Sequence, residues 1–249
     1  LQRFGKDVIG KHGEFLAGSI ALEDGVCLIH TNANYLPTRS KVGTAAPNGD
    51  WEPGLYGYLL QSGRNARVVN WELEGEAALR SCEVAVLQDL GNEPSADLPQ
   101  ALERLAARGG QVVAFMDHAL ARGAGFRFEA TTSTGPAATA FTWAGGGEFS
   151  QDKPEFLSRY ALADERCESV LSAAGASAGF RCRWGRGRFT QIGAPIYKEF
   201  NSAQYAHLGD IRQRDALWRE LGWSKAPRVA VAPMTPKVIA PKLTWNGAI

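Results

Sequence analysis

Five polar residues stand at the ends of predicted buried strands, where their side chains could do chemistry. They are His30, Asn32, Asp89, Asp117 and His118. Imidazole and carboxylate groups carry general acid–base catalysis, and both bind divalent metals. In an open parallel sheet the carboxyl ends of the strands share an edge, and ligands bind in the crevice outside it. Polar residues of this kind also end strands as turn formers, so the competing interpretation is a strand edge without catalytic function.

Four short apolar runs predict the strands that would position these residues. Each run is apolar throughout rather than alternating, which is typical of parallel strands covered by helices on both faces. The runs are residues 26–32, 67–71, 83–89 and 111–115. Their spacing is typical of βαβ units. The sequence therefore predicts an α/β fold with a parallel sheet.

Apolar stripes at helical spacing predict helices over residues 50–63, 95–108 and 211–222. Ser95 is the expected N-cap of the second helix, and glycines end all three. The residues expected to face inward are Trp51, Leu55, Tyr58 and Leu59 in the first helix, Leu98, Leu102 and Leu105 in the second, and Ile211, Leu217, Trp218 and Leu221 in the third.

The pattern changes after residue 118. Residues 119–150 are rich in Gly, Ala and Thr and contain two strand-like runs, which predict a hairpin or a lid over the sheet. A helix is predicted near residues 163–173. The stretch "FRCRWGRGRFTQIG" (180–193) predicts two strands joined by a Gly-Arg-Gly turn. A last short strand is predicted at residues 228–233.

Arginines interleave with aromatic residues in that same stretch. They are Arg181, Arg183, Arg186 and Arg188, with Trp184 and Phe189 between them. Such a pattern can stack on and neutralise nucleic acid. The formal net charge of the chain is only +1, which argues against a surface devoted to nucleic acid or acidic lipid. A solvated strand face explains the arginines, and no nucleic-acid partner is expected.

The chain contains four cysteines without a C-x-x-C pair or a short metal-ligand spacing. We expect buried, reduced thiols, with Cys27 inert in the first strand. Reduced thiols fit a reducing compartment, so a cytoplasmic location is expected. No apolar run approaches the roughly 20 residues that span a bilayer, and no membrane contact is expected. Neither a metal nor another cofactor is predicted.

The order of elements resembles that of a known module. The stretches that carry the resemblance are "KHGEFLAGS", "GVCLIHTN", "GDWEPGLYGYLLQSG", "CEVAVLQDL", "LERLAARGGQVVAF" and "GRGRFTQIG". They resemble the glutamine-amidotransferase-like domain, or trimerisation domain, that follows the catalytic barrel of β-galactosidase-like glycoside hydrolases. The resemblance covers roughly residues 1–232, and residues 119–150 depart from it.

The resemblance implies a three-layer, flavodoxin-like and class I amidotransferase-like sheet with helices on both faces. The apolar spacing of Phe4, Val8 and Phe15, without a start signal before it, predicts a helix over residues 1–20 that leads from a missing upstream domain. The expected α/β domain covers residues 21–232, with 119–150 as an atypical insertion, and a linker or further domain follows over 233–249. The upstream domain would be the catalytic barrel acting on a carbohydrate. This module would be a non-catalytic part that assembles a homo-oligomer.

An active amidotransferase of this fold carries Gly-x-Cys-x-Gly just after the fourth strand, with a His-Glu pair later in the chain. The matching stretch here is Phe115-Met116-Asp117-His118-Ala119. It has no cysteine, and no His-x-Glu follows. The glutaminase nucleophile is absent. We therefore expect Asp117 to cap the turn after the strand and His118 to face solvent or residues 119–150.

Two other functions are compatible with the sequence. One is a stand-alone small-molecule or metal-dependent hydrolase that uses the strand-end crevice. The other is a sugar-binding module, because aromatic faces pack on the apolar C–H patches of sugar rings. The aromatic candidates for sugar contact are Trp51, Tyr56, Tyr58 and Trp143.

Overall fold

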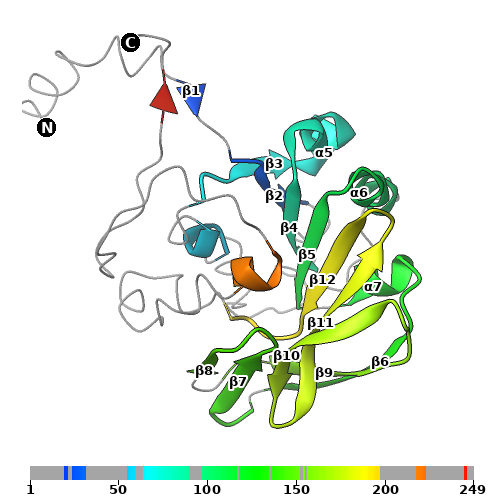
Figure 1. Ribbon diagram of the computed structural model, residues 1–249. Helices are drawn as coiled ribbons and strands as arrows, with labels where there is room; N and C mark the ends of the chain where they lie inside the picture. Colours follow the sequence, from blue (N-terminus) through cyan, green and yellow to red (C-terminus); the bar gives the residue numbers. More distant parts are fainter. Residues whose placement is uncertain are drawn as a thin grey trace, which may run out of the picture.

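The computed structural model describes residues 20–21, 24–31, 55–59, 64–89, 97–116, 118–134, 136–151, 154, 156–196, 217–222 and 244–245. These residues form a mixed α/β fold around one large mixed sheet of eleven strands (Figure 1). A separate antiparallel pair joins β1 (Ile20–Ala21) to β13 (Thr244–Trp245). None of the helices in the described part of the chain has the length and apolar character that a membrane crossing requires.

One half of the sheet is parallel. It consists of β2 (Val26–His30), β3 (Arg67–Asn70), β4 (Val84–Asp89), β5 (Gln111–Met116) and β12 (Gly187–Ile192). The spatial order is β3-β2-β4-β5-β12, and every neighbouring pair is parallel. The four strands that the apolar runs predict are all confirmed.

Both faces of β2, β4 and β5 carry buried side chains. Successive side chains of a strand point to opposite faces, so each of these strands contributes to two cores. Along β4, Val84 and Val86 join one core cluster, whereas Ala85 and Leu87 join another. The first cluster also contains the predicted inward residues of helical residues 55–59 and 217–220. The second contains side chains of α5 (Trp71–Glu74), the 3-10 helix η3 (Gly75–Ser81) and α6 (Leu98–Ala107).

The predicted helix over 95–108 is confirmed as α6, with Leu98, Leu102 and Leu105 fully buried. Asp97 occupies its N-cap position, and Ser95 lies outside the described residues. Gly109, at φ +99°, ends the helix in a conformation that L side chains rarely adopt. The stop that the double glycine predicts is therefore confirmed.

The other half of the sheet is antiparallel. From β12 the order continues through β11 (Ala176–Trp184), β10 (Cys167–Ala173), β7 (Thr139–Trp143) and β8 (Glu148–Gln151). β9 (Phe156–Leu162) pairs with β11, and β6 (Phe128–Thr134) pairs with β9. The predicted hairpin over 180–193 is confirmed as β11 and β12. Residues 119–150 form the short helix α7 (Ala119–Gly123) and three strands that extend the sheet, rather than a separate lid.

The helix predicted near residues 163–173 is wrong, because this segment forms β10. Its residues pair with β11 on one side and β7 on the other. Val170, Leu171 and Ala173 are buried between these neighbours. Short apolar runs fit a helix and a strand equally well, and here the neighbouring strands decide.

The prediction of reduced thiols is also wrong. Cys27 and Cys82 form one disulfide, and Cys167 and Cys182 form another. The first joins β2 to the residue after η3, and the second joins directly opposite residues of β10 and β11. Disulfide connectivity depends on which segments meet in space, and cysteine spacing does not reveal it. Cys27 is buried, as expected, but it carries no thiol.

The predicted strand at 228–233 lies outside the described residues, as do residues 1–19 and 233–243.

Candidate functional site

The predicted crevice lies at the edge where β2, β4 and β5 end. The three strands are parallel, and Asp89 at the end of β4 stands opposite Met116 of β5. His30 is the last residue of β2 and is half-buried. The strand ends therefore share one edge, as predicted. Asn32, Asp117 and the side chain of Asp89 lie outside the described part of the structure, so their convergence stays a prediction.

His118 packs against aromatic rings. Its ring meets the ring of Phe128 edge-on, with 5.7 Å between centroids, and that of Tyr160 at 6.3 Å. Phe128 and Tyr160 themselves pack against Phe180. Phe128 belongs to residues 119–150, so the expectation that His118 faces this segment is confirmed. Edge-on ring contacts of this kind stabilise packing, which favours a structural role for His118.

The residues at the end of β5 offer no thiol nucleophile. All four cysteines of the chain are paired in disulfides, and none lies at this strand end. Only a thiolate acts as the nucleophile in cysteine chemistry. Within the described residues, no three His, Cys, Asp or Glu side chains group closely enough to hold a metal ion.

Two of the four aromatic candidates for sugar contact lie in the core. Tyr58 is 1% exposed and Trp143 is 2% exposed, and both belong to one apolar cluster. Tyr56 is half-buried against the same cluster, and Trp51 lies outside the described residues. A sugar ring needs an accessible aromatic face, so this burial favours a packing role for Tyr58 and Trp143.

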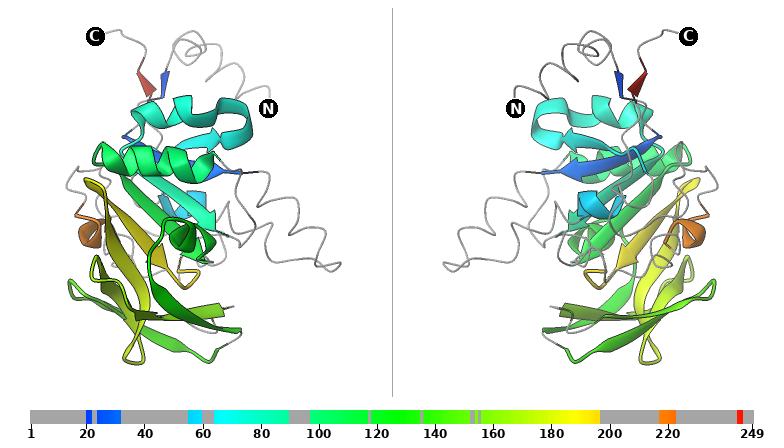
Figure 2. Two further views of the ribbon diagram at one scale, coloured as in Figure 1. Left: turned by 90° about the vertical axis from the view of Figure 1, so that its right-hand side faces the viewer. Right: turned by 90° about the vertical axis from the view of Figure 1, so that its left-hand side faces the viewer.

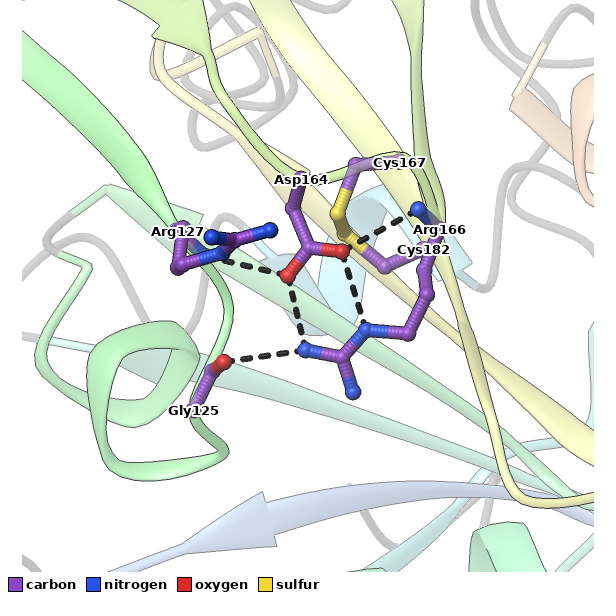
Figure 3. Close-up of polar contacts among 6 residues, drawn as sticks. All are labelled: Gly125, Arg127, Asp164, Arg166, Cys167 and Cys182. Carbon is purple, nitrogen blue, oxygen red and sulfur yellow. Dashed lines mark hydrogen bonds and ion pairs between the residues drawn. A yellow bond between two sulfur atoms is a disulfide. The ribbon is translucent and has the colours of Figure 1, made fainter.

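The sequence does not predict one densely bonded charged group that the structure reveals. Asp164, in the turn between β9 and β10, has a side chain only 3% exposed (Figure 3). Its two oxygens accept from the Nε and Nη2 groups of Arg166 at 2.9 and 2.7 Å. They also accept from the backbone N–H groups of Arg166 at 3.1 Å and of Arg127 at 3.2 Å. The Nη2 group of Arg166 further donates to the carbonyl oxygen of Gly125 at 2.9 Å.

We call Asp164, Arg166, and the backbone of Gly125 and Arg127 the turn clamp. The Arg166 side chain bonded to Asp164 lowers the pKa of this carboxyl well below its ordinary value, aided by the two backbone N–H donors and opposed by burial. A carboxylate held ionised in this way does not exchange protons near neutral pH, so it is unsuited to general acid–base catalysis.

The turn clamp joins segments that are distant in sequence. It ties the turn after β9 to the end of α7 and the start of β6, beside the disulfide of Cys167 and Cys182 (Figure 3). The Asp-x-Arg spacing at 164–166 was the available signal in the sequence. It was missed because a helix was predicted there, in which residues two apart do not face each other.

The sequence matches no protein-family model, and no curated protein matches it. Solved structures do resemble the fold. The β-galactosidase from Bacillus circulans sp. alkalophilus matches 87% of this chain with a TM-score of 0.63 and 13% identity. The cold-adapted β-galactosidase from Rahnella sp. R3 matches 90% with a TM-score of 0.62 and 12% identity. An exo-β-1,4-mannosidase from Opitutaceae bacterium strain TAV5 matches 80% with a TM-score of 0.55 and 17% identity. This chain spans about a third of the length of these proteins: 33%, 35% and 36%.

Proposed function

We propose that this chain is a non-catalytic, amidotransferase-like assembly domain of a β-galactosidase-like glycoside hydrolase. The observation that carries the proposal is the fold match to about a third of two β-galactosidases. A match to about a third of each enzyme is the match expected of one domain within a larger enzyme. The catalytic barrel would then lie elsewhere in the parent polypeptide and would act on the carbohydrate.

The strand order supports the amidotransferase-like part of the proposal. Numbered along the chain, the five parallel strands have the spatial order 2-1-3-4-5, which is the order of flavodoxin-like sheets. Core clusters on both faces of the sheet suit a three-layer arrangement. The missing thiol at the end of β5 supports a role other than glutamine hydrolysis.

We further propose an oxidising compartment for the folded chain. The cytoplasmic location was expected from reduced thiols, and that basis is gone because all four cysteines are paired. Disulfides persist mainly in secreted or periplasmic proteins, whereas cytosolic reductants keep thiols reduced.

Light scattering on the intact parent protein tests the assembly role. We expect an oligomer at micromolar concentration, because an assembly domain presents a specific interface, which typically buries on the order of 800 Å² per partner. A monomer at high micromolar concentration would overturn the assembly role.

The Asp117→Asn substitution in the parent enzyme tests whether the strand-end crevice is catalytic. We expect turnover within about twofold of wild type, because Asn preserves most capping hydrogen bonds, typically at a cost of about 1 kcal/mol or less. If the crevice were catalytic, loss of the acid–base group would reduce turnover by about 10²–10⁴-fold. A hundredfold loss with an unchanged circular dichroism spectrum would contradict the non-catalytic assignment.

A further inference from the structure

The hairpin of β11 and β12 carries arginines that the proposed function does not use. Its aromatic residues Trp184 and Phe189 point to one face of the sheet, where they are 7% and 0% exposed. Arg183 and Arg188 point to the other face and are exposed. Binding of nucleic acid by stacking needs accessible rings. The interleaved arginines and aromatic residues therefore do not form a nucleic-acid surface, because the sheet separates them.

Arg183 and Arg188 stand directly opposite each other in the ladder of β11 and β12. The Arg183 N–H donates to the Arg166 carbonyl at 3.0 Å, toward β10. The Arg188 N–H donates to the Gly110 carbonyl at 3.3 Å, toward β5. Both donors thus point away from the opposite strand, which identifies a non-hydrogen-bonded pair. In such a pair the Cα atoms are about 4.5 Å apart, the closer of the two spacings in an antiparallel ladder. We call these two residues the arginine pair.

The arginine pair lacks a counterion among the residues that the structure describes. Neither of its side chains takes part in a hydrogen bond or an ion pair there. Two glutamates contact the hairpin through Arg181, and both carboxylates are engaged: Glu168 accepts from Arg181, and Glu220 accepts from the Gly145 N–H. Like charges placed directly opposite destabilise a sheet. Natural sequences break local rules of this kind mainly at functional sites, so the pair indicates an anion supplied from elsewhere.

The end of the hairpin next to the arginine pair is fixed in place. Both views of Figure 2 show its turn at the end of α6. A Cβ atom at Gly187 would lie 1.9 Å from the Gly110 carbonyl oxygen. One at Gly185 would lie 3.0 Å from the Cα atom of Ala107. Only glycines allow this close approach, and the exposed Arg186 stands between them. A surface held in this way loses little entropy when a partner binds.

The same face of β11 already shows which anion its arginines accept. Arg181, two residues before Arg183, donates through Nε to a carboxylate oxygen of Glu168 at 3.0 Å. A planar guanidinium matches a carboxylate with two parallel N–H groups. We propose that the arginine pair, together with Arg186, binds an acidic peptide segment of a partner protein through its carboxylates. The inference goes beyond the proposed assembly role and does not depend on it.

Binding of a fluorescent hexaglutamate peptide to the intact protein tests this surface. Fluorescence anisotropy at about 0.02 M ionic strength, where screening is weak, should show saturable binding. The Arg183→Gln, Arg188→Gln variant should bind at least about tenfold more weakly, because it loses charge-assisted hydrogen bonds. The control Arg80→Gln removes an exposed arginine of η3 and should bind as wild type does. Absence of binding to the wild type, or equal binding by the double variant, would overturn the proposal.

A labelled oligothymidylate of the same charge distinguishes carboxylate from phosphate as the preferred anion. We expect it to bind no more tightly than hexaglutamate, because the rings of the hairpin are buried and offer no stacking surface. Tighter binding of the oligothymidylate by about tenfold or more would replace the acidic peptide with a nucleic acid, and the proposal would fail.

The Arg188→Glu substitution separates binding from folding. It converts a like-charge pair into an ion pair with Arg183, so Tm should rise, while hexaglutamate binding should be lost. A raised Tm also shows that the variant is folded, so loss of binding cannot be assigned to unfolding. Wild-type affinity for the peptide in this variant would refute the arginine pair as the binding surface, and a lowered Tm would refute the cost assigned to the pair.

Discussion

Removal of the Cys27–Cys82 disulfide is expected to lower the free energy of unfolding by about 4 kcal/mol. The two cysteines are 55 residues apart, and the chain-entropy model assigns a closed loop of this length about 4 kcal/mol. A chain of this size loses roughly 2–4 °C of Tm per kcal/mol. Thermal unfolding of the Cys27→Ala, Cys82→Ala double variant should therefore show a Tm lower by roughly 8–16 °C.

The second disulfide supplies the matched comparison. Cys167 and Cys182 are 15 residues apart. The chain-entropy model assigns a closed loop of this length a stabilisation of about 3 kcal/mol. The Cys167→Ala, Cys182→Ala variant should thus lose less stability than the first. Thiol titration of the wild-type protein in denaturant without reductant should find no free thiol. Four titratable thiols in protein purified from an oxidising compartment would contradict both disulfides.

Loss of the Asp164 carboxylate is the second large expected effect. The Asp164→Ala variant removes the acceptor of four hydrogen bonds and leaves Arg166 without its ion pair. Breaking a buried pair by removing one partner costs about 3–5 kcal/mol. Because the Arg166 side chain is 42% exposed, water replaces part of what it loses, and we expect about 3 kcal/mol. Urea unfolding monitored by circular dichroism measures this difference.

The difference in unfolding free energy between wild type and the Asp164→Asn variant should depend on pH, and the sign of that dependence follows from the pKa of Asp164. The folded-state pKa of Asp164 is lowered, first of all by the Arg166 side chain. Its stabilising contribution is fully present above the unfolded pKa, about 3.9, and is lost as pH falls below it toward the folded pKa. The stability gap between wild type and Asp164→Asn should therefore be constant above about pH 5 and narrow below about pH 4. A gap that widens on acidification would contradict this assignment.

An exposed ion pair provides the control for the turn clamp. Glu168 accepts from Arg181 across β10 and β11, with its side chain 64% exposed. Exposed pairs contribute about 1 kcal/mol or less. Glu168→Gln should accordingly leave urea unfolding almost unchanged, and a loss equal to that of Asp164→Ala would indicate a general effect of charge rather than the turn clamp.

The sequence by itself determined four of the five strands in the parallel half of the sheet. These strands are continuous apolar runs such as residues 83–89, and the helix over 98–107 has one apolar face and a glycine stop. These signals are local, because strand and helix periodicities are set within a few residues. The sequence also sufficed to show that no cysteine stands at the end of β5, because the type of a residue can be read without a structure.

Only the tertiary structure decided the features that depend on partners distant in sequence. The segment 167–173 is a strand because β7 and β11 lie on either side of it. Cys27 is oxidised because Cys82 lies beside it. Asp164 is ionised and buried because Arg166 and the backbone at residue 127 meet it in a turn. Each of these outcomes follows from long-range pairing, whose free energy is absent from any local window of the sequence.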